Sequence, residues 1–393
     1  MVNLQLIADY MQKHDLAAVV AIDPWNTTIL KNFYSYIHLN TVDWANHPTI
    51  VAFPRGDEPF IVDFMSWDPP TEMRPAWIKE YYPGTRIGMC GLGKNLADLA
   101  EALKQRGAHK GAIGLDLQFL PVTAMQALQS LLPDATFVDA TNLFLQIRAV
   151  KSEKEIGFIK KAIAIQEEAL GKVIEAYREG VTIQGLSRLF ITEVVNRGGD
   201  FRWAINRGVA TRWYDQPCPW PDPRFSDDYT ITANAGAEIC FDTGVAYEGW
   251  ITDMARGIYL ADPPPDVVNR HKVLARAHEV MRTVIQPGMT ARQLWVACHK
   301  ALRAEFGNSY MSNFGRPGMP FCVIHSIGLF CHERPWVSLP EPAELHDDEV
   351  TFEVNSVFAI EPGCLEDMYV LAENGPVRLN TLPQELIVVP FRQ

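Results

Sequence analysis

The stretch from residue 239 to 258, ICFDTGVAYEGWITDMARGI, constrains the fold and the chemistry of this chain more than any other. Apolar and polar residues alternate up to Asp242, and glycines mark a turn before a second strand that carries Asp253. A carboxylate in a half-buried hairpin is costly unless it is hydrogen-bonded, neutralised or coordinated. Taken alone, the pair favours the plainer interpretation, in which Asp242 opens a turn and Asp253 is solvated. A metal site therefore requires further donors.

Length and charge narrow the possible partners. The chain has 393 residues, 48% of them hydrophobic, which is enough for two domains with sizeable cores. Its formal net charge of −12 argues against nucleic acid or an anionic membrane surface, because both bind clustered Lys and Arg. We expect a small-molecule substrate instead.

Cysteine usage and the first residues indicate the compartment. The seven cysteines form no C-x-x-C pair, so they indicate neither a disulfide scaffold nor a zinc ribbon. The opening sequence MVNLQLIADYMQKHDL is typical of an amphipathic helix, and no apolar run reaches the length of a membrane span. We therefore expect a cytoplasmic protein.

The pattern of the chain changes near Arg148, and we predict domains 1–147 and 148–393. The first alternates helix and strand signals, which is typical of an α/β domain. Its expected helices are 3–14, 96–106 and 122–132, and its expected strands are 17–22, 49–53, 60–62, 112–115 and 136–139. A long helix then opens at Ser152, with Glu155 three residues later as a capping box, and is expected to close at Gly180.

The second domain mixes helices with antiparallel strands, so the predicted fold class is α+β. The expected helices are 182–197, 266–285 and 290–306, and the strands beyond the acidic hairpin are 322–324, 357–361 and 368–372. A proline-rich loop at 217–228 leads to the first acidic strand, and loops of this kind often border a site.

Two later segments offer further donors. The run HSIGLFCHERP presents His325 and His332 around a glycine turn. In the run AIEPGCLEDM, a four-residue loop at 362–365 would place Glu361 directly opposite Glu366, about 5 Å away across a hairpin. Like charges so placed repel unless a cation lies between them.

The combined set holds four carboxylates and one imidazole: Asp242, Asp253, His325, Glu361 and Glu366. Oxygen and imidazole donors in this proportion suit two bridged divalent metal ions, such as manganese, zinc, iron or cobalt. The identity of the metal stays open.

At these residues the chain resembles the pita-bread metallohydrolases, the group of prolidase, aminopeptidase P, methionine aminopeptidase and creatinase. Four segments agree in order: RAVKSEKEI at 148–156, DTGVAYEGWITDMAR at 242–256, HSIGLFCHERP at 325–335, and EPGCLED at 361–367 followed by ENG at 373–375. Because residues 1–147 also resemble the N-terminal domain of creatinase and prolidase, the resemblance covers nearly the whole chain. It implies a C-terminal pita-bread domain behind an N-terminal α/β creatinase-like domain.

The resemblance also implies roles for the site residues. Asp242 would bind one metal, Asp253 and Glu366 would bridge both, and His325 and Glu361 would complete the two shells. Glu361 would in addition shuttle the proton of a metal-bridging hydroxide. His332 would hydrogen-bond the substrate or the tetrahedral intermediate. If the short hairpin did not place Glu366 at the site, Glu373 would be the alternative ligand. The resemblance also implies a homodimer.

The segment RGVATRWYDQP at 207–217 departs from the peptidases of this group, which carry a substrate-contacting histidine upstream of the first metal-binding Asp. Its Arg- and Trp-rich character is similar to the branch of dimethylsulfoniopropionate lyase, where tryptophans hold an onium cation. Substrate contacts are therefore expected from Arg212, Trp213, Tyr214 and Trp203, and also from Arg334, although each tryptophan also fits an ordinary core position.

Three arginines have two interpretations each. Arg212, Arg256 and Arg334 each either anchor a substrate carboxylate by bidentate pairing or form a structural ion pair. The sequence does not decide between the two.

The leading hypothesis is a metal-dependent hydrolase of the prolidase or aminopeptidase P type, which cleaves an amide-like C–N bond in an Xaa-Pro dipeptide or a small zwitterion. The alternatives are a lyase of the dimethylsulfoniopropionate type, a creatinase-like amidinohydrolase and a binding module. Gly244 stands where relatives of that lyase carry a second acid. Creatinase has replaced its metal ligands, whereas all five positions are filled here.

Overall fold

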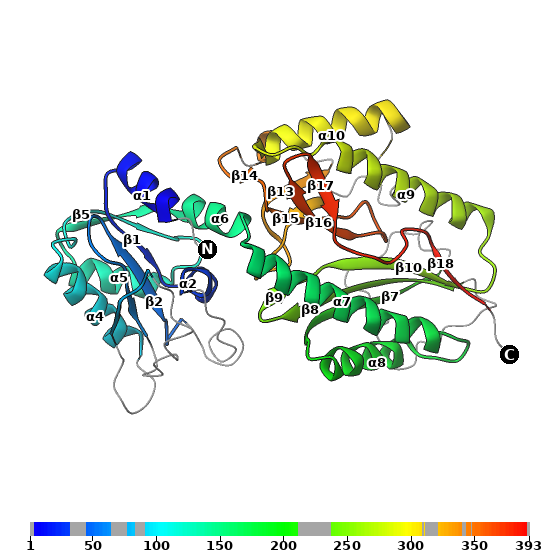
Figure 1. Cartoon of the computed structure of the whole chain (residues 1–393), viewed down its shortest axis with the longest axis horizontal. Coiled ribbons are helices and arrows are strands. Elements are labelled where there is room, and N and C mark those ends of the chain that lie inside the picture. Colours follow the sequence, from blue (N-terminus) through cyan, green and yellow to red (C-terminus); the bar gives the residue numbers. More distant parts are fainter. Residues whose placement is uncertain are drawn as a thin grey trace. The chain divides into compact units, whose positions relative to one another are not determined.

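The computed structural model describes residues 4–31, 45–63, 77–82, 91–210, 237–308, 310, 321–339, 343–346 and 348–390. It divides into two compact units, Met1–Arg148 and Ala149–Gln393, both shown in Figure 1. Among the described residues, none of the helices combines the length and the apolar character of a membrane span.

The described part of the first unit is built on one mixed sheet with strand order β4-β3-β2-β1-β5-β6. The central strand, β1, pairs antiparallel with β2 and parallel with β5. The strands are β1 (Leu16–Ala21), β2 (Ile50–Pro54), β3 (Phe60–Val62), β4 (Glu80–Tyr82), β5 (Gly111–Leu115) and β6 (Ala135–Asp139). The helices are α1 (Leu4–Lys13), α2 (Pro24–Lys31), α4 (Leu92–Gln105), α5 (Val122–Leu131) and α6 (Thr141–Ala149).

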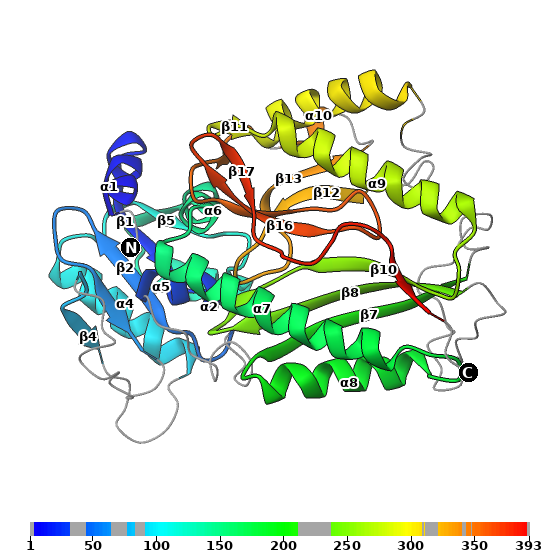
Figure 2. The same ribbon diagram turned by 45° about the vertical axis from the view of Figure 1, so that its right-hand side comes forward.

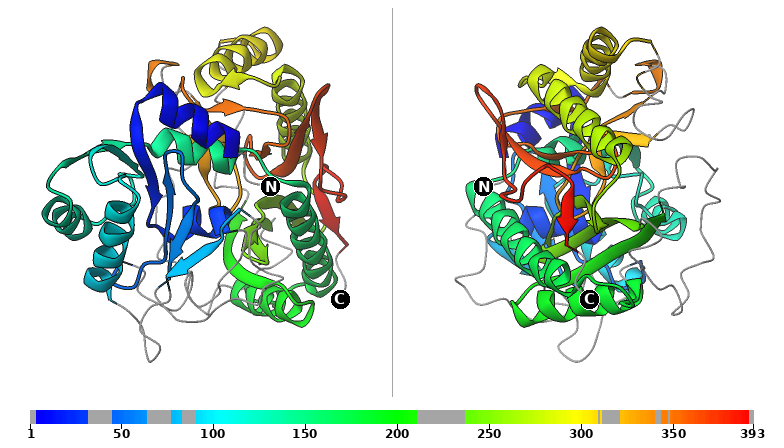
Figure 3. Two further views of the ribbon diagram at one scale, coloured as in Figure 1. Left: turned by 60° about the vertical axis from the view of Figure 1, so that its left-hand side comes forward. Right: turned by 90° about the vertical axis from the view of Figure 1, so that its right-hand side faces the viewer.

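Helices α4 and α5 cover this sheet and share an apolar core with its central strands (Figure 3, left). All the expected elements of this unit are present, with α4 beginning four residues earlier than the expected residue 96. The sequence pattern did not predict α2, β4 or α6. The expected α/β character of the unit is confirmed.

The second unit begins with two helices, α7 (Glu153–Ala176) and α8 (Ile183–Asn196), followed by antiparallel strands. These are β7 (Asp200–Ala210), β8 (Ala237–Tyr247), β9 (Trp250–Ile251) and β10 (Met254–Leu260), and β18 (Ile387–Val389) adds to β10 in parallel. The predicted capping box at the start of α7 is present, because Ser152 and Glu155 bond each other's backbone N–H groups.

The predicted end of this helix at Gly180 is wrong. The helix ends at Ala176, and Tyr177 leaves it in an extended conformation with φ −69° and ψ 113°. Only 2% of Tyr177 is exposed, and its ring packs into the core between α7, α8 and the sheet. Burial of this aromatic ring therefore ends the helix before the glycine is reached.

The second half of this unit repeats the plan of two helices followed by antiparallel strands. Its helices are α9 (Pro265–Val284) and α10 (Ala291–Phe306). One sheet has the order β13-β12-β15-β16-β17, and β11 pairs with β14 separately. The strands are β11 (Met289–Thr290), β12 (Phe321–Ser326), β13 (Glu333–Leu339), β14 (Thr351–Phe352), β15 (Val357–Ile360), β16 (Asp367–Ala372) and β17 (Gly375–Arg378).

Each sheet of the second unit is covered by its own helix pair. Apolar residues of α7 and α8 pack on β8 and β10, and those of α9 and α10 pack on β12, β13, β15 and β16. Figure 2 and the right-hand view of Figure 3 show the two helix pairs on opposite sides, with the strands between them. This arrangement confirms the α+β class and leaves the inner faces of the two sheets for polar residues.

Candidate metal centre

The first acidic hairpin joins β8 to β9 and β10 through a two-residue turn. Tyr247 pairs with Trp250, and the intervening Glu248 and Gly249 have φ values of 52° and 84°. Positive φ at both turn residues suits the tight turns whose twist matches that of the strands. Further along, Asp242 pairs with Ala255. Because Asp253 lies two residues before Ala255, the two aspartates share one face of the sheet.

The second acidic hairpin joins β15 to β16 in the expected register. Ile360 pairs with Asp367, so Glu361 and Glu366 occupy the next opposed positions at the start of the loop. The Glu361 N–H donates to the Val323 carbonyl at 2.9 Å, and the Glu366 N–H donates to the Ala255 carbonyl at 3.1 Å. The second of these bonds ties the loop directly to β10 of the first sheet.

His325 on β12 points into the space between the hairpins. Its Nε2 lies 3.5 Å from Glu366 Oε1, 3.7 Å from Glu361 Oε1 and 3.9 Å from Asp253 Oδ2. Its Nδ1 lies 3.3 Å from the Ser326 carbonyl oxygen, which accepts when that nitrogen carries the proton. This tautomer leaves the Nε2 lone pair for a ligand, as is usual for metal-binding histidine.

The five predicted ligands therefore meet from three separate segments, the two acidic hairpins and β12. Donor atoms lie within 4.8 Å of one another in three overlapping groups: Asp242 with Asp253 and Glu366, His325 with Glu361 and Glu366, and Asp253 with His325 and His332. Asp253, His325 and Glu366 each belong to two groups. The structure thus brings His332 to the same place as the five ligands.

The donor set has the chemistry that a divalent cation requires. Asp253 Oδ1, His325 Nε2 and Glu366 Oε1 are buried and have no hydrogen-bond partner among the described residues. Buried polar atoms are ordinarily paired, and an unpaired one is costly. Hard carboxylate oxygens together with a neutral imidazole nitrogen suit divalent transition metals. The residues present therefore fit the ions that the sequence predicts.

The pKa shifts describe the same crowding. Burial, with the charges of Glu366 and Asp242, raises the pKa of Asp253 well above its usual value. Burial, with the charges of Glu361 and Asp242, likewise raises the pKa of Glu366. Burial and the neighbouring His332 lower the pKa of His325. All three shifts disfavour the charged form of a side chain, and nearby cations would favour the ionised carboxylates.

Cys331 and His332 approach this group from the turn between β12 and β13. The Cys331 thiol donates to Asp253 Oδ2 at 3.0 Å, and burial and the Asp253 charge raise its pKa. His332 Nε2 lies 3.9 Å from the same oxygen, and its ring centroid lies 4.2 Å from that of His325. Partial burial lowers the pKa of His332, whose side chain remains 49% exposed.

A buried ionic network supports the Glu366 end of the site. Arg256, which is 1% exposed, forms an ion pair with Asp367 and donates to the carbonyls of Glu366 at 2.7 Å and Ala255 at 2.8 Å. Its contacts decide between the two interpretations above: Arg256 forms a structural ion pair. An isolated bridge between Arg256 and Leu365 further joins β10 to the loop.

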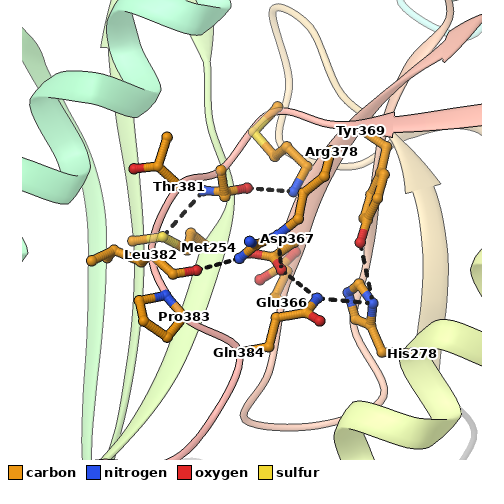
Figure 4. Close-up of polar contacts among 12 residues, drawn as sticks. Met254, His278, Glu366, Asp367, Tyr369, Arg378, Thr381, Leu382, Pro383 and Gln384 are labelled. Carbon is orange, nitrogen blue, oxygen red and sulfur yellow. Dashed lines mark hydrogen bonds and ion pairs between the residues drawn. The ribbon is translucent and has the colours of Figure 1, made fainter.

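Asp367 is the acceptor at the centre of this network. It also receives bonds from Arg378 at 2.8 Å and from Gln384 at 2.7 Å, as Figure 4 shows. Burial alone would raise the pKa of Asp367, but Arg256 and the bond from Arg378 outweigh burial and lower it. His278 lies at the edge of the network, 3.4 Å from the Tyr369 hydroxyl.

The predicted substrate contacts and the alternative ligand either lie outside the described residues or do not belong to the donor groups. Arg212, Trp213 and Tyr214 lie outside the described residues, and the side chain of Trp203 on β7 also does. The Arg334 guanidinium lies over the Trp336 ring, 5.6 Å from its centroid. Glu373, the alternative ligand, lies in the exposed turn between β16 and β17 and belongs to none of the groups formed by the described donors.

Sequence reasoning missed the thiol of Cys331 and the acceptor Asp367. The signal for Asp367 was its place directly after Glu366 in an otherwise apolar strand, where a buried acid requires a cationic partner. The signal for Cys331 was its place directly before His332.

Comparison with known proteins agrees with this architecture. Residues 157–381 match the family described as metallopeptidase family M24, and residues 4–150 match the creatinase/prolidase N-terminal domain. The Xaa-Pro dipeptidase of Lactobacillus delbrueckii subsp. lactis is 24% identical over 331 residues, which are 79% of this chain and 82% of that protein.

Two solved structures have the same fold over nearly the whole chain. The Xaa-Pro dipeptidase of Bacillus anthracis superposes with a TM-score of 0.74 at 17% identity, covering 98% of each chain. The X-Pro aminopeptidase of Thermotoga maritima superposes with a TM-score of 0.70 at 18% identity, covering 99% of this chain and 100% of that one. Likeness at this level of identity shows the fold, and the chemistry has to be argued from the site.

Proposed function

The chain belongs to metallopeptidase family M24, and from this premise we propose that it is a metal-dependent hydrolase of a small substrate with an amide-like C–N bond. An Xaa-Pro dipeptide is the first candidate substrate, because relatives that share the architecture bear the name Xaa-Pro dipeptidase. One observation carries the proposal: five donor side chains from three segments converge, and three of their buried donor atoms have no partner among the described residues.

The metal ions would be held by Asp242, Asp253, His325, Glu361 and Glu366. Divalent ions bound there would polarise a substrate carbonyl and lower the pKa of water, which would make a nucleophile available near neutral pH. By the family resemblance, Asp253 and Glu366 would be the carboxylates shared by two ions, and each has two oxygens and belongs to two of the donor groups. Manganese is the first metal to test, followed by cobalt, zinc and iron.

Two side chains of the site are placed to handle protons and substrate. The Glu361 side chain is 19% exposed, whereas those of Asp253 and Glu366 are 5% and 1% exposed. Glu361 is therefore the carboxylate of these three that best reaches bulk water, and we assign it the role of general base. The half-exposed His332 lies beside the donors and would donate a hydrogen bond to the substrate.

The alternative functions receive less support. The relatives reported above are named as dipeptidases and an aminopeptidase, so the lyase is not favoured. A binding module or a metal-free amidinohydrolase has no chemical need for the five converging donors. We also propose, from the family resemblance, a homodimer in the cytoplasm, which light scattering and fractionation would test.

The decisive test uses chelator-stripped protein reconstituted with manganese, cobalt, zinc or ferrous iron. Each form is incubated with Xaa-Pro dipeptides, with matched Xaa-Ala dipeptides, with creatine and with dimethylsulfoniopropionate. The proposal expects metal-dependent release of free proline, and D253N serves as the control without activity. Acrylate from the onium acid would favour the lyase instead. Metal-loaded protein that hydrolyses none of the dipeptides would overturn the proposal.

A further inference from the structure

The turn at residues 327–332 between β12 and β13 carries Cys331 and His332 to the metal centre. The His332 side chain is 49% exposed, so burial of its own ring contributes little to fixing its position. Its place beside His325 must therefore come mainly from the backbone of the turn. What fixes that backbone also fixes a side chain that is proposed to contact the substrate.

The carboxylate of Glu333 lies inside this turn. Its side chain is 2% exposed, and its Oε1 accepts from the N–H groups of Leu329 at 3.2 Å and Phe330 at 3.3 Å. A Cβ added at Gly328 would lie 2.8 Å from Glu333 Oε2, so glycine leaves the room that the carboxylate occupies. The outer side of the turn is tied to β9, because the Ile251 N–H donates to the Gly328 carbonyl at 2.8 Å.

Lys151 supplies the cation for this carboxylate. Its side chain is 0% exposed, and its Nζ lies 3.7 Å from Glu333 Oε2 and 3.4 Å from the Ala149 carbonyl. The Lys151 N–H donates to the Asn355 carbonyl at 3.1 Å, which fixes the backbone just before α7. Loss of one member of a buried ion pair leaves an uncompensated charge, whereas loss of both is often close to neutral.

We propose that the buried Lys151–Glu333 pair positions the turn that carries His332. Lys151 and Glu333 are then positioning residues for the reaction, and they act through His332. Lys151 places a positive charge beside the buried Glu333 carboxylate, and that carboxylate accepts from two N–H groups of the turn. The kinetic test of this inference rests on the proposed function, and a labelling test does not.

The kinetic test uses K151M, E333Q, the double variant K151M/E333Q, and each single variant combined with H332A. Misplacement of a substrate-contacting group by about 1 Å can cost about 100-fold in rate, so each single variant should lower kcat by about 10-fold to 100-fold. The bound metal should stay at the wild-type amount, because His332 is not among the five proposed ligands. The double variant should recover most of the loss, because the carboxamide that E333Q introduces still accepts from the turn and no charge is left unpaired.

The H332A background separates positioning from general damage. If Lys151 acts through His332, K151M has no further effect on kcat once His332 is absent. Three results would each overturn the inference. One is a wild-type kcat for both single variants, and another is a fall in kcat on adding K151M to H332A as large as in the wild type. The third is a kcat of the double variant no higher than that of K151M. Should K151M fail to fold, E333Q and the double variant give the same comparison.

The labelling test needs no substrate. Cys331 lies in the same turn, so a loosened turn should react faster with iodoacetamide, by about 10-fold in K151M, because local opening governs access. R270M is the matched control, since it breaks the pair between Arg270 and the buried Glu238 away from this turn, and its Cys331 should label at the wild-type rate. Equal labelling in K151M and wild type would overturn the inference, whether or not the protein hydrolyses any dipeptide. A failure to hydrolyse any dipeptide would count only against the proposed function.

Discussion

The metal-free protein should become more stable when Asp253 is replaced by Asn. Asp253 and Glu366 are 4% and 1% exposed, and their donor atoms lie within 4.8 Å of each other. Without cations, two negative charges in such a place repel each other and are poorly solvated. The side chains that make the site useful therefore destabilise the empty fold, a trade often found at functional sites.

The size of the effect follows from Coulomb's law. Two unit charges 4.8 Å apart repel by about 3.5 kcal/mol at an effective dielectric constant of about 20. Uptake of a proton relieves part of this repulsion, since burial and the neighbouring charges raise the pKa of both groups. We therefore expect D253N to raise the free energy of unfolding of the metal-free protein by between about 1 and 3 kcal/mol.

The assay is urea unfolding of chelator-stripped wild type and D253N, with D262N as control because Asp262 is exposed and outside the site. D262N should unfold like the wild type. Added manganese should then stabilise the wild type, by about 4 kcal/mol when the free ion is at about 1,000 times its dissociation constant, and leave D253N nearly unchanged. A metal-free D253N that is less stable than the metal-free wild type would show that repulsion between Asp253 and Glu366 does not destabilise the metal-free protein.

Further predictions concern groups around the site. Burial lowers the pKa of His278 from 6.5 to about 4, so as the pH falls the unfolded chain binds a proton at this histidine before the folded chain does. Lowering the pH from 7.5 to 5 should therefore reduce the free energy of unfolding of the wild type by about 2 kcal/mol more than that of H278Q, as measured by urea titration. Equal reductions would contradict this. R256M removes a buried partner of Asp367 and should lower the free energy of unfolding by about 3 kcal/mol and weaken cobalt binding in a spectroscopic titration. R276M, which breaks an exposed ion pair, is the control and should leave cobalt binding at the wild-type level. Cobalt binding by R256M at the wild-type level would contradict a supporting role of Arg256 for Glu366.

The register of the second acidic hairpin could be predicted from the sequence because it is a local property. A loop of four residues between two apolar strands fixes which residues face each other, and Ile360 pairs with Asp367 as that count requires. The start of α7 was equally local, since Ser152 and Glu155 lie three residues apart in the chain.

Contacts between distant segments could not be predicted in this way. Arg256 and Asp367 are 111 residues apart, and nothing near either residue shows that their side chains form an ion pair. The end of α7 depends on the burial of Tyr177 against other elements, which overrides the nearby Gly180. The helix α2 was missed although Asp23 caps it, accepting from the Asn26 N–H at 2.8 Å, because its eight residues are too few to show a clear apolar period.

The convergence of the five donors could be predicted from charge but not from contacts. The sequence shows acids at opposed positions in two hairpins, and a cation was the economical way to explain both. The packing of the two helix pairs determines which face of each sheet carries the acidic side chains toward the site. No local sequence pattern specifies that packing. The family resemblance supplied that missing step.

The metal content of the purified chain shows directly whether the five donors form a metal centre. Wild type, D253N and E366Q are stripped with a chelator, reconstituted with manganese, passed through a desalting column and measured by inductively coupled plasma mass spectrometry. We expect about two divalent ions per chain in the wild type and a clear loss in both variants. Wild-type protein that retains essentially no divalent ion, or variants that retain as much as the wild type, would contradict this expectation.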